Sequence, residues 1–176
     1  NYALKADGGV VNVNMNADKN AAGTVTTVIK GNAIANSAKA FANFDMDDAD
    51  STINIGLSDK ESSWTGVAFS KDNGSAGFPF KGIINLYLAN GATWNNEAWG
   101  KTNAAFEGSH VAKLAGGASA AAAGNIFQKD SNNLTIDNYS GNTNIFYAHT
   151  GNGEAASNYA AGDTVIKHAE KDSVVS

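Results

Sequence analysis

The fold is indicated most clearly by residues 51–57, Ser-Thr-Ile-Asn-Ile-Gly-Leu, in which Ile53, Ile55 and Leu57 are separated by single polar or small residues. Residues 84–88, Ile-Asn-Leu-Tyr-Leu, repeat the pattern. Successive side chains of a β-strand point to opposite faces of the sheet. A period of two therefore predicts short strands with one buried face, and it assigns Leu86 to the inner face and Asn85 to the outer face.

The same alternation recurs along most of the chain. It is clear in Val11, Val13 and Met15 and in Leu134 and Ile136, and weaker in residues 25–29, 42–46, 67–69 and 145–147. Turn-forming clusters such as Asp7-Gly8-Gly9 and Asn90-Gly91 separate these segments. Asn and Gly tolerate the left-handed backbone of tight corners. Only residues 118–123 suggest a helix, and glycines flank them on both sides.

The composition favours narrow coils over a thick core. The 176 residues include 31 Ala, 23 Asn and 19 Gly. A β-sandwich usually carries large side chains on both inner faces, whereas a narrow solenoid coil suits small residues beside one aliphatic ladder. The sequence therefore predicts an all-β chain in which residues 1–176 form a single β-solenoid of roughly eight irregular coils, with about 20 residues in each.

The charges exclude some function classes. All 12 cationic side chains are Lys, with no Arg, against 17 carboxylates and a net charge of −5. This balance argues against a nucleic-acid partner, which needs a basic face. The lack of Cys excludes disulfides and Cys-based zinc sites. No apolar run approaches the roughly 20 residues of a membrane-spanning helix.

Four phrases resemble, as an ordered set, the secreted passenger domains of bacterial autotransporters of the pertactin-like and adhesin type. They are Ser51–Gly66, Ile84–Trp94 with its Asn-Gly-Ala-Thr-Trp ending, Asn133–Gly141 and Gly162–Lys167. The resemblance implies a right-handed parallel β-helix on the surface of a cell with a Gram-negative-type outer membrane. It also implies that the chain is a fragment of a longer passenger, whose targeting segment and outer-membrane β-barrel would lie outside this sequence.

The function implied by this resemblance is adhesion or cell–cell aggregation through a broad polar surface. The expected partners are glycans or proteins of host or bacterial surfaces, or further copies of the protein. Two alternatives remain open at this point: a β-helix enzyme that acts on polysaccharide, and a structural stalk that presents a distal binding region. We expect no enzyme activity and no cofactor, and the sequence assigns no catalytic or ligand-binding residue.

Two groups of residues could bind a metal ion. The first is a group of aspartates, which could bind a hard cation because such cations prefer clustered carboxylates. It lacks the spacing of an EF-hand, and we expect it to be a solvated loop. The histidines lack the spacing that places two ligands on one helix face. In coils of about 20 residues, the last two histidines could stack on neighbouring coils. The acidic group comprises Asp45, Asp47, Asp48 and Asp50, and the histidines are His110, His149 and His168.

Other motifs have a plain structural interpretation. Asn73-Gly74-Ser75-Ala76-Gly77 resembles a nucleophile elbow but has Asn73 in place of the first glycine, and we expect a turn there. Sequons at Asn73, Asn133 and Asn138 are expected by chance in an Asn-rich chain. Trp64 and Trp94 each follow a predicted strand and are expected to cover coil corners, while Trp99 stays open as a sugar-stacking residue. Carboxylates on neighbouring coils could approach closely enough for glycoside hydrolysis.

Overall fold

The computed structural model describes residues 2–36, 50–71, 73–75, 78–100, 106–129, 133–147 and 162–176. Of residues 71, 73–75 and 78–80 it describes the backbone alone. The regular elements in this part of the chain are strands and one short 3₁₀-helix, η1, at Ala120–Ala122. The prediction of an all-β chain is confirmed, and the segment 118–123 contains a single 3₁₀ turn. No helix in the described residues is long and apolar enough to cross a membrane.

The strands form three parallel sheets and one hairpin. Sheet A contains β1 (Tyr2–Asp7), β4 (Asn32–Asn36) and β7 (Ala68–Lys71). Sheet B contains β2 (Val10–Val13), β5 (Ser51–Leu57), β10 (Gly82–Leu88), β12 (Ser109–Ala115), β14 (Leu134–Ser140) and β16 (Thr164–Ala169). Sheet C contains β3 (Val28–Lys30), β6 (Ser63–Thr65), β11 (Thr93–Asn96), β13 (Gly124–Gln128), β15 (Asn142–Tyr147) and β17 (Val174–Val175). The antiparallel hairpin joins β8 (Asn73–Ser75) to β9 (Phe78–Phe80).

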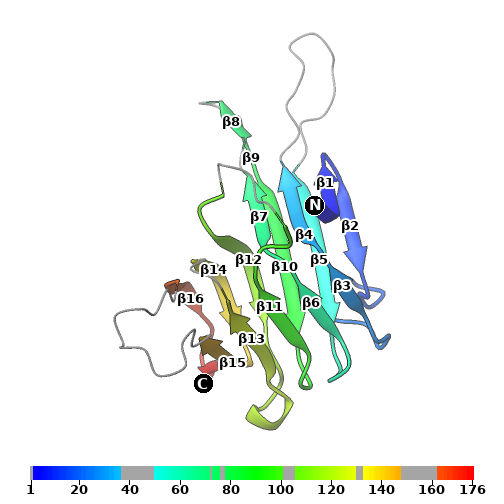
Figure 1. Cartoon of the computed structure of the whole chain (residues 1–176), viewed down its shortest axis with the longest axis vertical. Helices are drawn as coiled ribbons and strands as arrows, with labels where there is room; N and C mark the ends of the chain where they lie inside the picture. Colours follow the sequence, from blue (N-terminus) through cyan, green and yellow to red (C-terminus); the bar gives the residue numbers. More distant parts are fainter. Residues whose placement is uncertain are drawn as a thin grey trace.

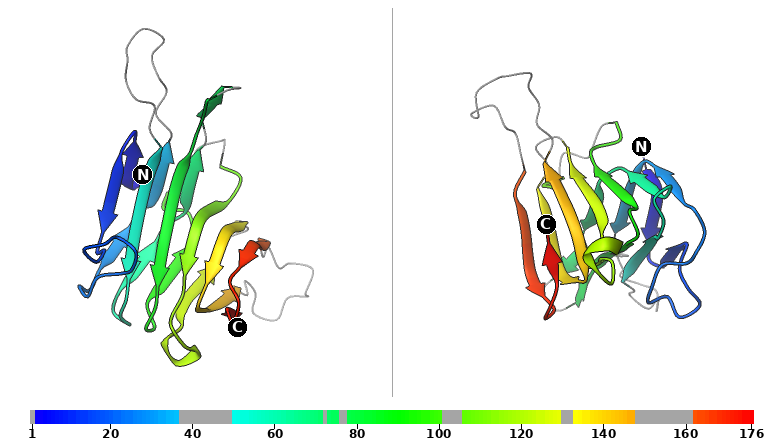
Figure 2. Two further views of the ribbon diagram at one scale, coloured as in Figure 1. Left: turned by 180° about the vertical axis from the view of Figure 1, so that it is seen from behind. Right: turned by 90° about the horizontal axis from the view of Figure 1, so that it is seen from below.

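The chain visits the sheets in a fixed order. It passes from sheet A to B to C three times, through β1 to β11 with the β8–β9 hairpin inserted after β7, and from β12 onward it alternates between sheets B and C. Neighbouring strands of one sheet therefore come from successive passages, and Figure 1 shows them side by side from β2 to β16. The views from behind and from below in Figure 2 show the sheets facing one another. This arrangement is consistent with a β-solenoid.

The number of coils differs from the expectation. Sheets B and C each hold six strands, so eight coils are not confirmed. Asn12 pairs with Asn54, 42 residues further along the chain, and Asn54 pairs with Asn85 after a further 31. These spacings exceed the expected 20 residues because loops of unequal length separate the strands. Irregular loops hide the repeat from any search for a fixed period.

The core consists of side-chain ladders that run across the strands. In sheet B, Ile55, Leu86, Leu114 and Tyr139 lie in register and are buried. Sheet C contributes Ile29, Trp64, Trp94, Ile126 and Ile145. Sheet A is lined by alanines, including Ala6, Ala33, Ala35 and Ala68. Small residues thus occupy the narrow side of the coil, and the predicted inner position of Leu86 is confirmed.

Some local expectations need correction. The strand expected to include Met15 ends at Val13, and Met15 makes only an isolated bridge to Ala22. The Asn73-Gly74-Ser75 motif is a strand of the hairpin and not a turn, because Ser75 pairs with Phe78. The segment 42–46 lies outside the described residues. The Asn90-Gly91 turn is confirmed, with φ angles of 54° and 78° that suit these two residue types.

The end of sheet A positions the candidate site. β7 is the last strand of sheet A in the described part of the chain, while sheets B and C continue through several more strands. The Ala68 N–H donates to Ser109 Oγ of β12 at 3.1 Å instead of pairing with another strand. A change in the cross-section of the solenoid therefore brings β7 beside β12.

Candidate functional site

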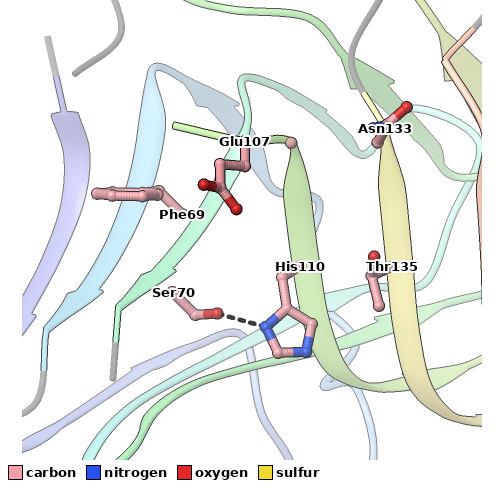
Figure 3. Close-up of a pocket in the computed structure, with 7 residues that line it drawn as sticks. Phe69, Ser70, Glu107, His110, Asn133 and Thr135 are labelled. Atoms are coloured by element: carbon pink, nitrogen blue, oxygen red, sulfur yellow. Dashed lines mark hydrogen bonds between the residues drawn. The ribbon is translucent and has the colours of Figure 1, made fainter. Parts of the chain in front are cut away.

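A cavity of about 280 Å³ lies where β7 meets β12. Two lining residues belong to β7, one belongs to β12 and two directly precede it, and one belongs to β14 and one directly precedes it (Figure 3). The lining residues are Phe69, Ser70, Glu107, Gly108, His110, Asn133 and Thr135. The lining is mainly polar, and Phe69, which packs edge-on against Phe106, forms an apolar wall.

Two side chains that line this cavity, Ser70 and His110, form a continuous hydrogen-bonded chain with Asp137 behind them. Ser70 Oγ lies 2.7 Å from His110 Nδ1, and His110 Nε2 lies 2.8 Å from Asp137 Oδ2. An ionised carboxylate only accepts hydrogen bonds. The proton of a neutral His110 ring is therefore held on Nε2 by Asp137, which leaves Nδ1 free to accept the Ser70 hydroxyl proton.

Asp137 is held in its ionised form. Its second oxygen, Oδ1, lies 2.8 Å from Lys167 Nζ of β16. Burial acts to raise the pKa of the Asp137 carboxyl, but the hydrogen bonds from Lys167 and His110, together with their positive charge, outweigh burial and lower the pKa. The carboxylate is consequently charged at neutral pH and can orient the imidazole.

Ser70 occupies a row of sheet A that otherwise faces the core. It lies in register with Ala35, which is fully buried. Ser70 is only partly buried because β7 is the last described strand of its sheet. The polar side chain at this position therefore meets the cavity, where its hydroxyl reaches His110.

The backbone of β7 also presents a donor at the cavity. Val67 O accepts a hydrogen bond from Ala33 N–H of β4 at 2.9 Å, so this carbonyl points toward β4. The N–H of the same peptide unit belongs to Ala68; it points the opposite way and donates to Ser109 Oγ. N–H groups of a strand alternate in direction. The Ser70 N–H, two residues after Ala68, is thus directed to the same side of β7, beside its own hydroxyl.

A shared irregularity in sheet B places Asp137. The pairing of β12 with β14 passes from Val111–Ile136 directly to Lys113–Asn138, and Ile136 and Tyr139 both face inward. The pairing of β14 with β16 passes the Asp137 position in the same way. Asp137 therefore lies where the alternation of inner and outer side chains changes phase, while the register between the strands stays constant.

The histidines and carboxylates singled out from the sequence have different environments. Only His110 lies in this site; His168 is exposed and in register with Asn138, and His149 lies outside the described residues. Asp50 is exposed and accepts a hydrogen bond from Lys81 N–H at 2.7 Å. Asp45, Asp47 and Asp48 also lie outside the described residues. No cluster of three or more His, Asp or Glu that could hold a metal ion occurs in the part of the chain described.

The tryptophans pack as structural residues, but not at corners. Trp64 and Trp94 lie within β6 and β11, are fully buried, and stack with their ring centroids 4.9 Å apart. Their indole N–H groups donate to Gly31 O and Gly66 O, each at 2.9 Å. The corner interpretation is wrong because both rings point into the core. Trp99 is 40% exposed, and its main chain bonds the Asn32 side chain.

The sequons have packing roles in two described cases. Asn133 Oδ1 accepts a hydrogen bond from Asp163 N–H, and the Asn138 amide donates to Ala112 O. The side chain of Asn73 is outside the description. Asn133 also lines the cavity.

Sequence reasoning missed Ser70, Asp137 and Lys167. Ser70 and His110 are 40 residues apart, and His110 and Asp137 are 27 apart, so no local motif joins them. The signal that could have found them is the spacing between neighbouring strands of sheet B, which places Asp137 beside Lys167. That spacing is irregular and becomes known only with the register.

A second polar feature runs along the outer face of sheet C. Ser63, Thr93, Asn125 and Asn144 lie in register on successive strands and are all partly exposed. Neighbouring members of this polar row are about 4.8 Å apart from strand to strand. The Asn144 amide donates to Asn125 Oδ1 at 3.0 Å.

Comparisons with protein-family models, with curated protein sequences and with solved structures found no match to this chain.

Proposed function

We propose that the chain belongs to a right-handed parallel β-helix displayed outside a bacterial cell, where it mediates adhesion or cell–cell aggregation. The observation that carries the proposal is the polar row on sheet C, Ser63, Thr93, Asn125 and Asn144. Parallel strands joined by crossover connections are nearly always right-handed. The row presents hydroxyl and amide donors and acceptors along the outer face of sheet C.

Such a surface binds through many weak contacts. Hydroxyl and amide groups on a sheet face suit the hydroxyl and amide groups of surface glycans, of surface proteins or of a second copy of the chain. One copy of the row provides little affinity, because each hydrogen bond replaces one made with water. Dense display of many copies raises the overall affinity by orders of magnitude through effective concentration.

The test uses the 176-residue polypeptide coupled densely to beads and as a free monomer. We expect the coated beads to cluster with bacterial or host cells, or with one another, while the monomer binds weakly and inhibits poorly. The double substitution Thr93→Glu and Asn125→Glu should reduce clustering at least tenfold, because two carboxylates interrupt the polar row.

The matched control carries the same two charges on the outer face of sheet B, as Thr52→Glu and Asn138→Glu. Thr52 is half-buried and Asn138 is exposed. The control beads should cluster like the parent at equal coupling density. Equal loss in both variants, or full clustering by the sheet C variant, would contradict the proposal. Absence of clustering by the parent beads would favour a stalk.

A further inference from the structure

We propose that Ser70, His110 and Asp137 form a nucleophilic site that hydrolyses short carboxylic esters. This activity goes beyond the proposed adhesion and rests on a different part of the molecule. Its basis is the cavity at the end of sheet A, where a serine hydroxyl, an imidazole and a carboxylate are joined by contacts of 2.7 and 2.8 Å.

The geometry satisfies two requirements of a serine nucleophile. The base must lie within hydrogen-bond reach of the hydroxyl, and a third group must orient the base. His110 Nδ1 meets the first requirement and the Asp137 carboxylate meets the second. His110 uses Nδ1 toward the serine and Nε2 toward the carboxylate, and either ring nitrogen can act as the base when the other carries the proton.

The Ser70 N–H provides a donor for the oxyanion that forms during attack. It is directed to the open side of β7, the side on which Ala68 N–H reaches Ser109. In acyl-transfer sites the backbone N–H of the nucleophile itself stabilises the oxyanion. A nucleophile on an edge strand gains this donor because one side of the strand is not paired with another strand.

The cavity indicates the chemical class of the substrate. A volume of about 280 Å³ accommodates a small acyl group and one ring of an alcohol. Phe69 offers an apolar wall to the acyl chain, whereas Asn133 and Thr135 can bond hydroxyl groups. The Glu107 carboxylate disfavours an acidic substrate. We therefore assign short acyl esters of neutral, hydroxyl-rich alcohols, such as O-acylated sugars.

The reaction balances without a further reactant except water. Ser70 Oγ attacks the ester carbonyl carbon while its proton passes to His110 Nδ1. The resulting oxyanion collapses, the carbon–oxygen bond to the alcohol breaks, and the alkoxide takes the proton from His110. Water then attacks the acyl-serine with His110 again as base, which releases the carboxylic acid and restores Ser70.

The first test is covalent labelling with a fluorophosphonate probe, mapped by mass spectrometry. We expect Ser70 to be labelled in the parent, and labelling to be lost in Ser70→Ala and strongly reduced in His110→Asn. Hydrolysis of p-nitrophenyl acetate should fall about 100-fold or more in kcat/KM in both variants. His168→Asn removes an exposed imidazole outside the cavity and should leave both readouts unchanged.

Asp137 acts through His110 and is a positioning residue. In Asp137→Asn the rising limb of the pH–rate profile should move to lower pH, because the carboxylate that stabilises the protonated imidazole is gone. Circular dichroism of each variant verifies that the β-structure is retained. Absence of Ser70 labelling in the folded parent, or hydrolysis by Ser70→Ala at the parental rate, would overturn the assignment. Clustering of coated beads by Ser70→Ala tests adhesion separately.

Discussion

At the scale of single residues, neighbours in one strand have opposite environments. Leu86 of β10 is fully buried, whereas the adjacent Asn85 is half-buried and donates from its amide to Asn54 Oδ1 at 2.8 Å. Asn54 in turn donates to Asn12 Oδ1 at 2.8 Å. The outer amides thus satisfy one another along the sheet, as the stacked apolar residues do within it.

We expect Leu86→Asp to destabilise the fold by several kcal/mol, because an unpaired carboxylate in an apolar ladder has no hydrogen-bond partner. This is a large part of the free energy of unfolding of a typical domain. Asn85→Asp at the next position should cost far less. Urea unfolding monitored by circular dichroism measures both, and equal stability of the two variants would contradict the assigned register.

The ionisation of Asp137 makes stability depend on pH. The pKa of this carboxyl is lowered in the folded state, so its contribution is present above its unfolded pKa of about 3.9 and disappears as the pH falls through the folded value. Parent and Asp137→Asn should therefore differ in unfolding free energy at pH 6 and converge toward pH 2. Asp18→Asn, which removes a carboxylate at an exposed position, is the matched control. A constant difference between parent and Asp137→Asn would contradict the prediction.

The sequence predicted the inner and outer faces of residues wherever alternation is unbroken, as in 51–57 and 84–88. It did not predict the partners of His110, because a side chain's neighbour on the next strand depends on loop length, and the loops vary. Ser70 carried no local signal either. Its exposure to the cavity follows from the position of β7 at the end of sheet A. No residue near Ser70 in the sequence indicates that position.

At the scale of elements, a broken alternation hid one strand of sheet B and shortened the prediction for another. β12 has its buried Val111 and Leu114 three residues apart, so a search for period two passes over it. The same phase change in β14 limited the predicted alternation to Leu134 and Ile136, although the strand continues to Ser140. Asp137 lies at the phase change in β14, where its carboxylate meets His110.

The tryptophan pair stacks along the inner face of sheet C, on the paired strands β6 and β11. In Trp94→Phe the ring stays apolar, but Gly66 O loses the indole N–H that lies at 2.9 Å. A buried carbonyl without a partner costs about 1–3 kcal/mol, so we expect a loss of that size in urea unfolding monitored by circular dichroism. Trp99→Phe is the matched control, since Trp99 is 40% exposed. Equal effects in the two variants would mean that burial and the hydrogen bond are unimportant.

At the scale of the whole molecule, the end strands of sheets B and C expose apolar side chains. Val165 of β16 is 50% exposed and Val174 of β17 is 46% exposed, on the strands that lie last in their sheets. The outward edge of such a strand carries backbone groups able to pair with another chain. The outward edges of β16 and β17 are therefore available for association with another chain.

The 176-residue polypeptide should consequently associate as its concentration rises. Light scattering coupled to size-exclusion chromatography would report a mass above 18.1 kDa, and Val165→Lys with Val174→Lys should restore the monomer. Val25→Lys with Ala121→Lys adds the same charge at exposed positions outside the strands. Restoration of the monomer by this second pair would attribute the effect to net charge and contradict an edge-specific association.

The unequal spacing between paired strands has a mechanical consequence. Under tension applied at the two termini, the end strands of a parallel stack can detach by sequential rupture of neighbouring backbone bonds. Release of 25 residues, as between Val111 and Ile136, lengthens the chain by about 85 Å, and release of 42 residues, as between Asn12 and Asn54, by about 145 Å. A force–extension trace of this protein would therefore show steps of unequal length, in an order that reports which end yields first.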